Sequence, residues 1–194
     1  NFRSTLLIDA SFVSNNQATG TGSDGRGAGV YSSGNGGSAF LNIQNSTISI
    51  NSAGSQGGGV FNFNSSTLSI SSSTISNNTS NTEGGGIFNY NTSTLTISSS
   101  TISGNISNIL GGGILNRIRP LSLTNSTVTN NQTGKGAGIY SEGNGGSPIF
   151  VRIENSTISL NSASQEGGGI FNKNHSNLTS LSSSIVTNTA NGLA

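Results

Sequence analysis

The residues able to carry acid–base chemistry are few and widely spaced in this 194-residue chain. The six acids are Asp9, Asp24, Glu83, Glu142, Glu154 and Glu166. Glu83 and Glu166 each precede a glycine triplet, three repeats apart, so the strand spacing separates them by about 14 Å. That separation exceeds the distance between paired glycosidase carboxylates. We predict that both are solvated corner residues, that the chain has no catalytic residues, and that it is not an enzyme.

Metal and cofactor chemistry is not expected either. His175 is the one histidine and has no carboxylate beside it in the sequence, so it lacks the convergent partners of a metal or catalytic site. The absence of cysteine removes thiolate ligands and disulfides. Residues 20–25 match a dinucleotide-binding fingerprint by letter, but no strand-to-helix pattern surrounds them. Arg152 and Glu154 flank one residue of a strand, which predicts a local surface ion pair.

Charge and hydropathy restrict the partners and the location. The chain has seven Lys and Arg scattered singly and a net charge of +1, so we expect no nucleic-acid binding. No apolar run reaches the roughly 18 residues of a membrane-spanning helix, so we expect no membrane insertion of this segment. The sequence shows no signal peptide or initiator Met, which predicts a mature or excised piece of a larger product. Together with the lack of cysteine, this predicts a secreted or cell-surface, extracellular location.

A repeat of 25–31 residues organises the chain. A Gly-x-Gly triplet followed by Val or Ile begins at positions 27, 57, 84, 111, 136 and 167. Each step carries three short apolar segments, for example Gly86-Ile87-Phe88-Asn89, Leu95-Thr96-Ile97 and Ser100-Thr101-Ile102-Ser103. Their period of two predicts strands with one buried face. We therefore predict an all-β right-handed parallel β-helix of about seven coils, each with three short strands.

This solenoid is predicted to be one domain over residues 1–194, with a partial first coil at 1–26 and further coils starting near the six triplets. Three interior columns are expected. The first holds Val13, Ile48, Ile75, Ile102, Val128, Ile158 and Val186. The second holds Ile8, Ile43, Ile70, Ile97, Leu123, Ile153 and Leu181, and the third Val30, Val60, Ile87, Ile114, Ile139 and Ile170. Corner asparagines are predicted to stack as an internal amide ladder at Asn51, Asn78, Asn105, Asn131 and Asn161.

These phrases carry a family resemblance. Gly-Gly-Gly-Ile-Phe-Asn, Leu-Thr-Ile and Ser-Thr-Ile-Ser-Gly-Asn resemble the repeats of bacterial right-handed parallel β-helix proteins. They are also similar to the Gly-Gly-Ala-Ile and Phe-x-x-Asn repeats of chlamydial polymorphic outer-membrane autotransporters, with Ile-Ser-x-Asn in place of the Phe motif. The resemblance covers nearly the whole chain. It implies the fold, and it implies a surface protein, an adhesin or a polysaccharide-degrading enzyme.

One outward face carries a regular grid of hydroxyl groups. Its members flank the buried Ile or Val of the third strand: Thr47, Ser49, Thr74, Ser76, Thr101, Ser103, Thr127, Thr129, Thr157 and Ser159. The expected spacing is about 4.8 Å between coils and about 6.6–6.8 Å along a strand. Such a grid resembles the Thr-x-Thr faces of β-solenoid antifreeze proteins. The resemblance implies that this face would bind ice. Thr and Ser are also ordinary outward residues of a strand, so structural regularity is the competing interpretation.

A second outward row is aromatic. It comprises Tyr31, Phe61, Phe88, Leu115, Tyr140 and Phe171, each next to the buried residue of the glycine strand. If exposed, the row would be a ladder suited to stacking sugars or a partner surface. If packed under the inserts at 34–38 and 143–147, it would be a satellite core, which we favour because an exposed line of apolar residues invites aggregation.

The function predicted from these features is non-catalytic. We expect a secreted or cell-surface bacterial β-helix segment for adhesion, display or filament assembly. Its expected partners are another copy, joined end to end through open coils, or a surface or glycan ligand. Ice binding through the Thr-x-Ser face is the alternative, and a polysaccharide-binding or polysaccharide-acting protein is the third hypothesis.

Overall fold

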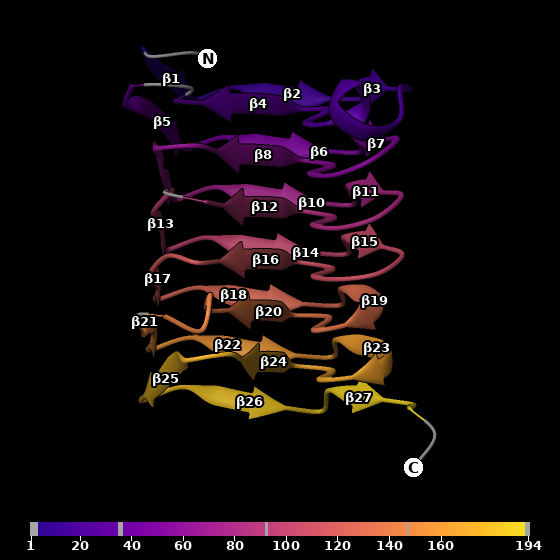
Figure 1. Cartoon of the computed structure of the whole chain (residues 1–194), viewed down its shortest axis with the longest axis vertical. Coiled ribbons are helices and arrows are strands. Elements are labelled where there is room, and N and C mark those ends of the chain that lie inside the picture. The colour runs from indigo at the N-terminus through magenta and orange to yellow at the C-terminus, as the bar shows by residue number, and fades with distance from the viewer. Residues whose placement is uncertain (1–3, 35–36, 92, 147, 193–194) are drawn as a thin grey trace.

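The chain folds into stacked coils of parallel β-structure (Figure 1). A computed structural model describes residues 4–34, 37–91, 93–146 and 148–192. Within these residues the strands form four parallel sheets, and a short 3-10 helix, η1, spans Gly22–Gly25. The chain is thus an all-β parallel β-solenoid of about six turns, and the predicted fold class is confirmed.

We number the sheets by their order within a coil. Sheet 1 follows the glycine triplets and contains β4 (Val30–Ser33), β8 (Val60–Phe63), β12 (Ile87–Tyr90), β16 (Ile114–Arg117), β20 (Ile139–Glu142) and β24 (Ile170–Lys173). Sheet 2 contains β1 (Thr5–Asp9), β5 (Ala39–Gln44), β9 (Ser66–Ser71), β13 (Leu95–Ser98), β17 (Leu121–Thr124), β21 (Ile149–Glu154) and β25 (Ser176–Leu181).

Sheet 3 carries the Thr-x-Ser phrase. It contains β2 (Phe12–Ser14), β6 (Thr47–Ser49), β10 (Thr74–Ser76), β14 (Thr101–Ser103), β18 (Thr127–Thr129), β22 (Thr157–Ser159) and β26 (Ser184–Val186). Sheet 4 contains β3 (Gln17–Ala18), β7 (Ser52–Ala53), β11 (Thr79–Ser80), β15 (Ile106–Ser107), β19 (Gln132–Lys135), β23 (Ser162–Glu166) and β27 (Thr189–Ala190).

The sequence predicts three strands per coil, but the structure has a fourth, which forms sheet 4. Several of its strands are only two residues long, as in Ser52–Ala53 and Thr79–Ser80. A period-two pattern needs four or more residues to be recognised, so these strands carry no readable alternation. They exist because the backbone groups after each interior asparagine pair with the neighbouring coil, as when the Ser52 N–H donates to the Asn16 carbonyl at 2.9 Å.

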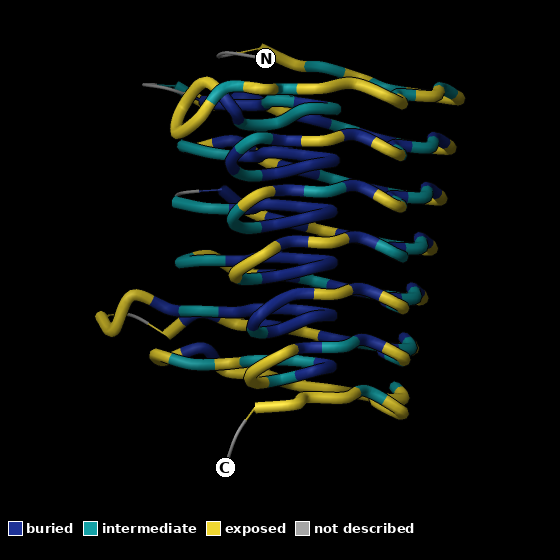
Figure 2. The backbone as a smooth tube through the Cα atoms, turned by 90° about the vertical axis from the view of Figure 1, so that its right-hand side faces the viewer, coloured by how far each residue is buried: buried dark blue, intermediate teal, exposed yellow. Residues whose placement is uncertain are grey.

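The interior is filled by aliphatic columns that run along the solenoid axis. The first two predicted columns are buried through the middle coils, where Ile43, Ile48, Ile75 and Ile97 are each at most 1 % exposed. The third predicted column, on sheet 1, is confirmed from Val60 to Ile139. Figure 2 shows buried chain through the middle of the stack and exposed chain in the last coil. A further column on sheet 2, missed in the sequence, holds Leu41, Leu68, Leu95, Leu121 and Val151.

In the last coil the sequence places two interior residues wrongly by one position, Val186 in the first column and Leu181 in the second. Ile158 pairs with Ile185, and Val186 lies beside Ser159 on the outward side. Likewise Ser180, not Leu181, is the partner of Ile153. The last coil lacks the Ser-Thr-Ile-Ser phrase, and its aliphatic pair at 185–186 offers two registers of which the strand pairing selects one.

The predicted amide ladder is confirmed. Asn78 donates from Nδ2 to Oδ1 of Asn105 at 3.0 Å, and its backbone N–H donates to the same oxygen at 3.0 Å. The same contacts join each member from Asn16 to Asn188. A second ladder, not predicted, links Asn62, Asn89 and Asn116 at 2.8 Å. Within the described residues, no helix has the length and apolar character needed to span a membrane.

Candidate functional site

Charged and aromatic side chains gather on the outer side of sheet 1. Along β12, Ile87 and Asn89 are fully buried in the solenoid, whereas Phe88 and Tyr90 belong to the outer side, as period two requires. The middle outward position forms the aromatic row Tyr31, Phe61, Phe88, Leu115, Tyr140 and Phe171. The last position forms a terminal row of Phe63, Tyr90, Arg117, Glu142 and Lys173.

A third row borders the same face. It consists of the residues before the glycine triplets, namely Arg26, Gln56, Glu83, Leu110, Lys135 and Glu166. Bridges pair Glu83 with both Gln56 and Leu110, so this pre-glycine row is also in register from coil to coil. The aromatic row therefore lies between two rows that carry most of the charge of the chain.

The aromatic row is a satellite core. Phe61, Phe88 and Tyr140 are at most 2 % exposed, and Leu115 is fully buried among them. The rings stack along the axis, with centroids 4.8 Å apart for Phe61 and Phe88. The packed alternative thus describes this row, and the exposed ladder does not. Cations cover it: the Arg26 guanidinium lies 5.4 Å from the Phe61 ring centroid and that of Arg117 lies 5.5 Å from Tyr140.

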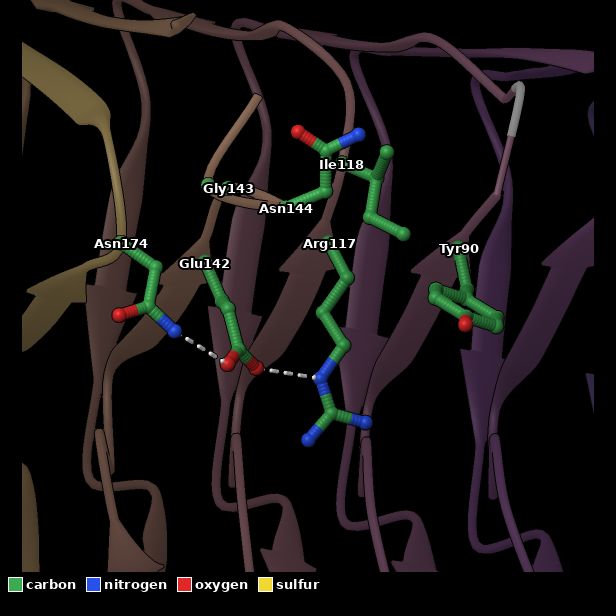
Figure 3. A pocket seen from close by; sticks show the side chains of 8 residues that line it. Tyr90, Arg117, Ile118, Glu142, Gly143, Asn144 and Asn174 are labelled. Atoms are coloured by element: carbon green, nitrogen blue, oxygen red, sulfur yellow. Dashed lines mark hydrogen bonds and ion pairs between the residues drawn. The ribbon is translucent and has the colours of Figure 1, made fainter. Parts of the chain in front are cut away.

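The charges on this face form a network across coils. Arg117 pairs with Glu142 at 2.8 Å (Figure 3). Arg117 also pairs with Glu83 at 3.1 Å, and Lys173 pairs with Glu142 at 3.0 Å. Lys135 pairs with Glu166 at 2.9 Å nearby. The prediction that Glu83 is a solvated corner residue is wrong, because its side chain is 15 % exposed beneath Arg117. Glu166 is exposed as predicted.

The network fixes the ionisation of its members. Burial acts to raise the pKa of Glu142, but hydrogen bonds from Lys173 and Arg117 outweigh it, so this pKa is lowered. Burial acts to lower the pKa of Arg117, and the attraction of Glu83 and Glu142 raises it overall. Hydrogen bonds with Tyr140 and Glu142 raise the pKa of Lys173. All three groups therefore stay charged around neutral pH.

A cavity of about 510 Å³ opens beside this network. It extends from Tyr90 and Arg117 to Glu142, and the loops after the strands line its rim with Ile118, Asn144 and Asn174 (Figure 3). Asn174 donates from Nδ2 to Oε1 of Glu142 at 3.0 Å. Charged and amide side chains with fixed positions beside an aromatic ring can bind a polar ligand.

The arrangement has the chemistry of a binding site more than of a catalytic one. Glu83, Glu142 and Glu166 each form an ion pair with an arginine or lysine, and the pKa of Glu142 is lowered, whereas a general acid needs a raised pKa. In the described part of the chain, His, Cys, Asp and Glu form no group of three that would hold a metal ion. The predicted surface pair of Arg152 and Glu154 is confirmed at 2.9 Å.

The Thr-x-Ser face occurs where the sequence places it. Thr74 pairs with Thr47 and Thr101, and Thr127 pairs with Thr157, so the five strands are in register. The ten side chains are half-buried, and Thr129 and Ser159 lie 3.3 Å apart through their hydroxyl oxygens. The face is therefore a regular outward grid on sheet 3, and its role as a site stays a prediction.

The charged network was missed in the sequence although a signal for it exists. Tyr90, Arg117, Glu142 and Lys173 each stand three positions after the aliphatic residue that follows a glycine triplet. Aligning the coils on their triplets places these four side chains on neighbouring strands. Read along the chain, the same charges look scattered, because 34 residues separate Glu83 from Arg117.

A family model of the Chlamydia polymorphic membrane protein repeat matches residues 72–93. That segment covers β10, β11 and β12 with the turns between them. The chain fits a parallel β-helix repeat protein of the polymorphic membrane protein, or autotransporter, type. The repeat indicates a surface-exposed bacterial protein. No curated protein and no solved structure matches the chain.

Proposed function

We propose that the chain is a non-catalytic, extracellular adhesive segment of a bacterial surface protein. The observation that carries this proposal is the register of the coils, which places equivalent outward positions on neighbouring strands in continuous rows. The interior asparagine ladder holds that register from Asn16 to Asn188. Such a rod presents rows of regularly spaced contacts to one surface, and the sheet-3 row repeats its Thr and Ser side chains from coil to coil. Many contacts made together raise the strength of attachment through multivalency.

Adhesion is tested with beads that carry the purified chain. Beads with the folded chain are expected to stay on epithelial cells or on a bacterial matrix under flow, and beads with the heat-unfolded chain are expected to wash away. The same protein is incubated with soluble polysaccharides, and reducing ends are measured. Equal retention of folded and unfolded chain, or turnover of a polysaccharide, would overturn the proposal.

Ice binding is a second candidate, favoured by the grid on sheet 3. Its members lie in register on consecutive strands at the spacing of a parallel sheet, about 4.8 Å. Thermal hysteresis is the measurement. We expect Thr101→Tyr, in the middle of the grid, to abolish it, and Thr96→Tyr, on sheet 2 of the same coil, to preserve it. Absence of thermal hysteresis in the unmodified chain, or full activity of Thr101→Tyr, would exclude this face.

A further inference from the structure

We propose that the cavity between Tyr90 and Asn174 binds one uncharged pyranose unit of a glycan. The proposal deepens the adhesive function, on which it rests for its biological setting, by assigning a ligand class to one place on the rod. The cavity, about 510 Å³, falls in the range of roughly 300–1,000 Å³ typical of small-ligand sites.

Tyr90 supplies the platform for the sugar. Its ring stacks on Phe63 with centroids 5.6 Å apart and an interplanar angle of 25°, and Phe88 contacts it edge-on at 6.0 Å. These contacts hold the ring in place on one side. Because Phe63 lies one coil earlier, the opposite side of Tyr90 looks toward the coil of Arg117. An ordered aromatic ring beside a cavity packs well against the C–H face of a pyranose.

Arg117 leaves this side of Tyr90 accessible. Its guanidinium group is drawn toward Glu83 and Glu142 and lies 5.5 Å from the ring centroid of Tyr140. Figure 3 shows Tyr90 at one end of the cavity and the Arg117–Glu142 pair across from it. The cavity therefore has the Tyr90 ring on one side and the charged and amide side chains, its polar wall, on the other.

The polar wall holds hydrogen-bonding groups in fixed positions. The Glu142 carboxylate accepts from Arg117, Tyr140 and Asn174 and pairs with Lys173, so it holds these donors in place around the cavity. The groups that a sugar hydroxyl would meet are therefore the Arg117 guanidinium and the Asn144 and Asn174 amides that line the cavity. The Oδ1 atom of Asn144 accepts the Gly146 N–H at 3.0 Å, and this contact orients the Asn144 amide at the rim. Sugar hydroxyls both donate and accept, so a wall with planar guanidinium and amide groups suits them.

Charge selects an uncharged sugar over an acidic one. Two cations, Arg117 and Lys173, balance two anions, Glu83 and Glu142, within the network. A uronate or sialate would have to displace a carboxylate from Arg117, whose ion pairs are only about one-fifth exposed. A neutral pyranose needs no such exchange, because it uses the remaining donors and acceptors.

The test is direct binding of soluble sugars by saturation-transfer NMR and calorimetry. The probes are glucose, galactose, mannose and N-acetylglucosamine with their short oligomers, and oligogalacturonate as the acidic comparison. We expect at least one neutral sugar to bind with little dependence on salt. Tyr90→Ala should weaken binding at least tenfold, and Tyr90→Phe, which keeps the platform, should change it less than threefold.

Two further variants separate the site from the fold. Asn174→Gly suits the positive φ of 52° at that position and removes the amide, so it should weaken binding at least threefold in a folded protein. Phe40→Ala removes an aromatic side chain that is half-exposed on sheet 2 and should leave binding unchanged. Binding that survives both Tyr90→Ala and Asn174→Gly, a preference for oligogalacturonate, or no binding to any probe overturns the assignment.

The sugar test and the bead test fail independently. Absent sugar binding with retained bead attachment overturns this site and leaves adhesion through another face. Tyr90-dependent sugar binding without bead attachment supports the site and overturns the adhesive function.

Discussion

Arg117 donates from Nη1 to both carboxylate oxygens of Glu83 at 3.1 Å, although 34 residues separate the two side chains. The contact exists because each coil lies about 4.8 Å from the next. A side chain before one glycine triplet can therefore reach the end of the sheet-1 strand in the next coil, here β16. The same guanidinium donates from Nε to Glu142 at 2.8 Å. One cation thus joins carboxylates from separate coils above the satellite core.

Removal of this cation is expected to destabilise the protein. Arg117→Leu keeps an apolar stem against Tyr140 but leaves two carboxylates, each less than one-fifth exposed, without their shared partner. We expect a loss of about 2–3 kcal/mol in the free energy of unfolding, below the full cost for a deeply buried pair. Urea denaturation followed by circular dichroism measures it.

Arg152→Leu is the matched control, because Arg152 also pairs with a glutamate but is half-exposed on sheet 2. Its effect is expected to stay within about 0.5 kcal/mol, as for other surface pairs. Equal losses for the two arginines would show that the network over Tyr140 is no stronger than an ordinary surface ion pair.

Acid should weaken the same network through Glu142. Its pKa lies below the usual 4.5: burial acts to raise it, and hydrogen bonds from Lys173 and Arg117 more than compensate. As the pH falls, the unfolded chain takes up this proton first, so stability is present above about pH 4.5 and is lost as the pH drops through the lowered native value. Urea midpoints measured between pH 6 and pH 3 should therefore fall.

Glu142→Gln tests the assignment of that pH dependence. This variant should be less stable at pH 6 and should show a flatter decline below pH 4.5, since the titrating group is gone. The exposed Asp9, whose pKa is lowered by hydrogen bonds from Asn45 and Gln44, titrates in both proteins and leaves their difference unaffected. An unchanged slope in Glu142→Gln would assign the acid sensitivity to another group.

The fold was predictable because its signal repeats. Ile75, Ile102 and Asn105 recur at the same place in successive coils, and each copy meets its equivalent in space. Register failed only where the repeat degenerates, at Leu181 and Val186 of the last coil. A one-residue shift there exchanges the inward and outward sides. At 185–186 two adjacent aliphatic residues leave the pattern ambiguous, and at Leu181 the aliphatic residue stands at an outward position while Ser180 holds the inward one.

The candidate site was less predictable because it is built from departures from the repeat. Arg117 and Glu142 occupy a position held by Phe63 and Tyr90 in earlier coils, so they weaken the periodic signal. Their partners are set by side-chain reach across coils, as with Glu83 in the pre-glycine row. Burial of the aromatic row was foreseen as one alternative, but its cover of arginine and lysine side chains was not.

The interior ladder makes a strong stability prediction at Asn105. Its amide donates to the Ile75 carbonyl at 2.9 Å and to Asn131 at 3.0 Å, and its Oδ1 accepts from Asn78. Asn105→Ala leaves several buried polar groups unpaired, at about 1–3 kcal/mol each. We expect a loss of at least about 3 kcal/mol by urea denaturation.

The end of the ladder supplies the comparison. Asn16→Ala removes the side-chain hydrogen bond to Asn51, whereas the backbone N–H still donates to the same oxygen, so about 1 kcal/mol is expected. A loss at Asn105 no greater than at Asn16 would show that the ladder follows the backbone register without stabilising it.

The third glycine of each triplet should tolerate no side chain. A Cβ at Gly86 would lie 2.6 Å from the Gly113 carbonyl oxygen and 3.0 Å from the Asn105 amide, so neighbouring coils would have to separate. We expect Gly86→Ala to cost about 3 kcal/mol. The middle position differs, because Ala28 and Ala137 occupy it in two coils.

Gly146→Ala is the control. The nearest contact of its added Cβ would be Asn144 Oδ1 at 3.4 Å, so the free energy of unfolding is expected to change by no more than about 0.5 kcal/mol. Equal unfolding midpoints for the two variants would mean that the coils adjust to the added methyl group, and the close approach of backbone at Gly86 would then be no constraint on the repeat.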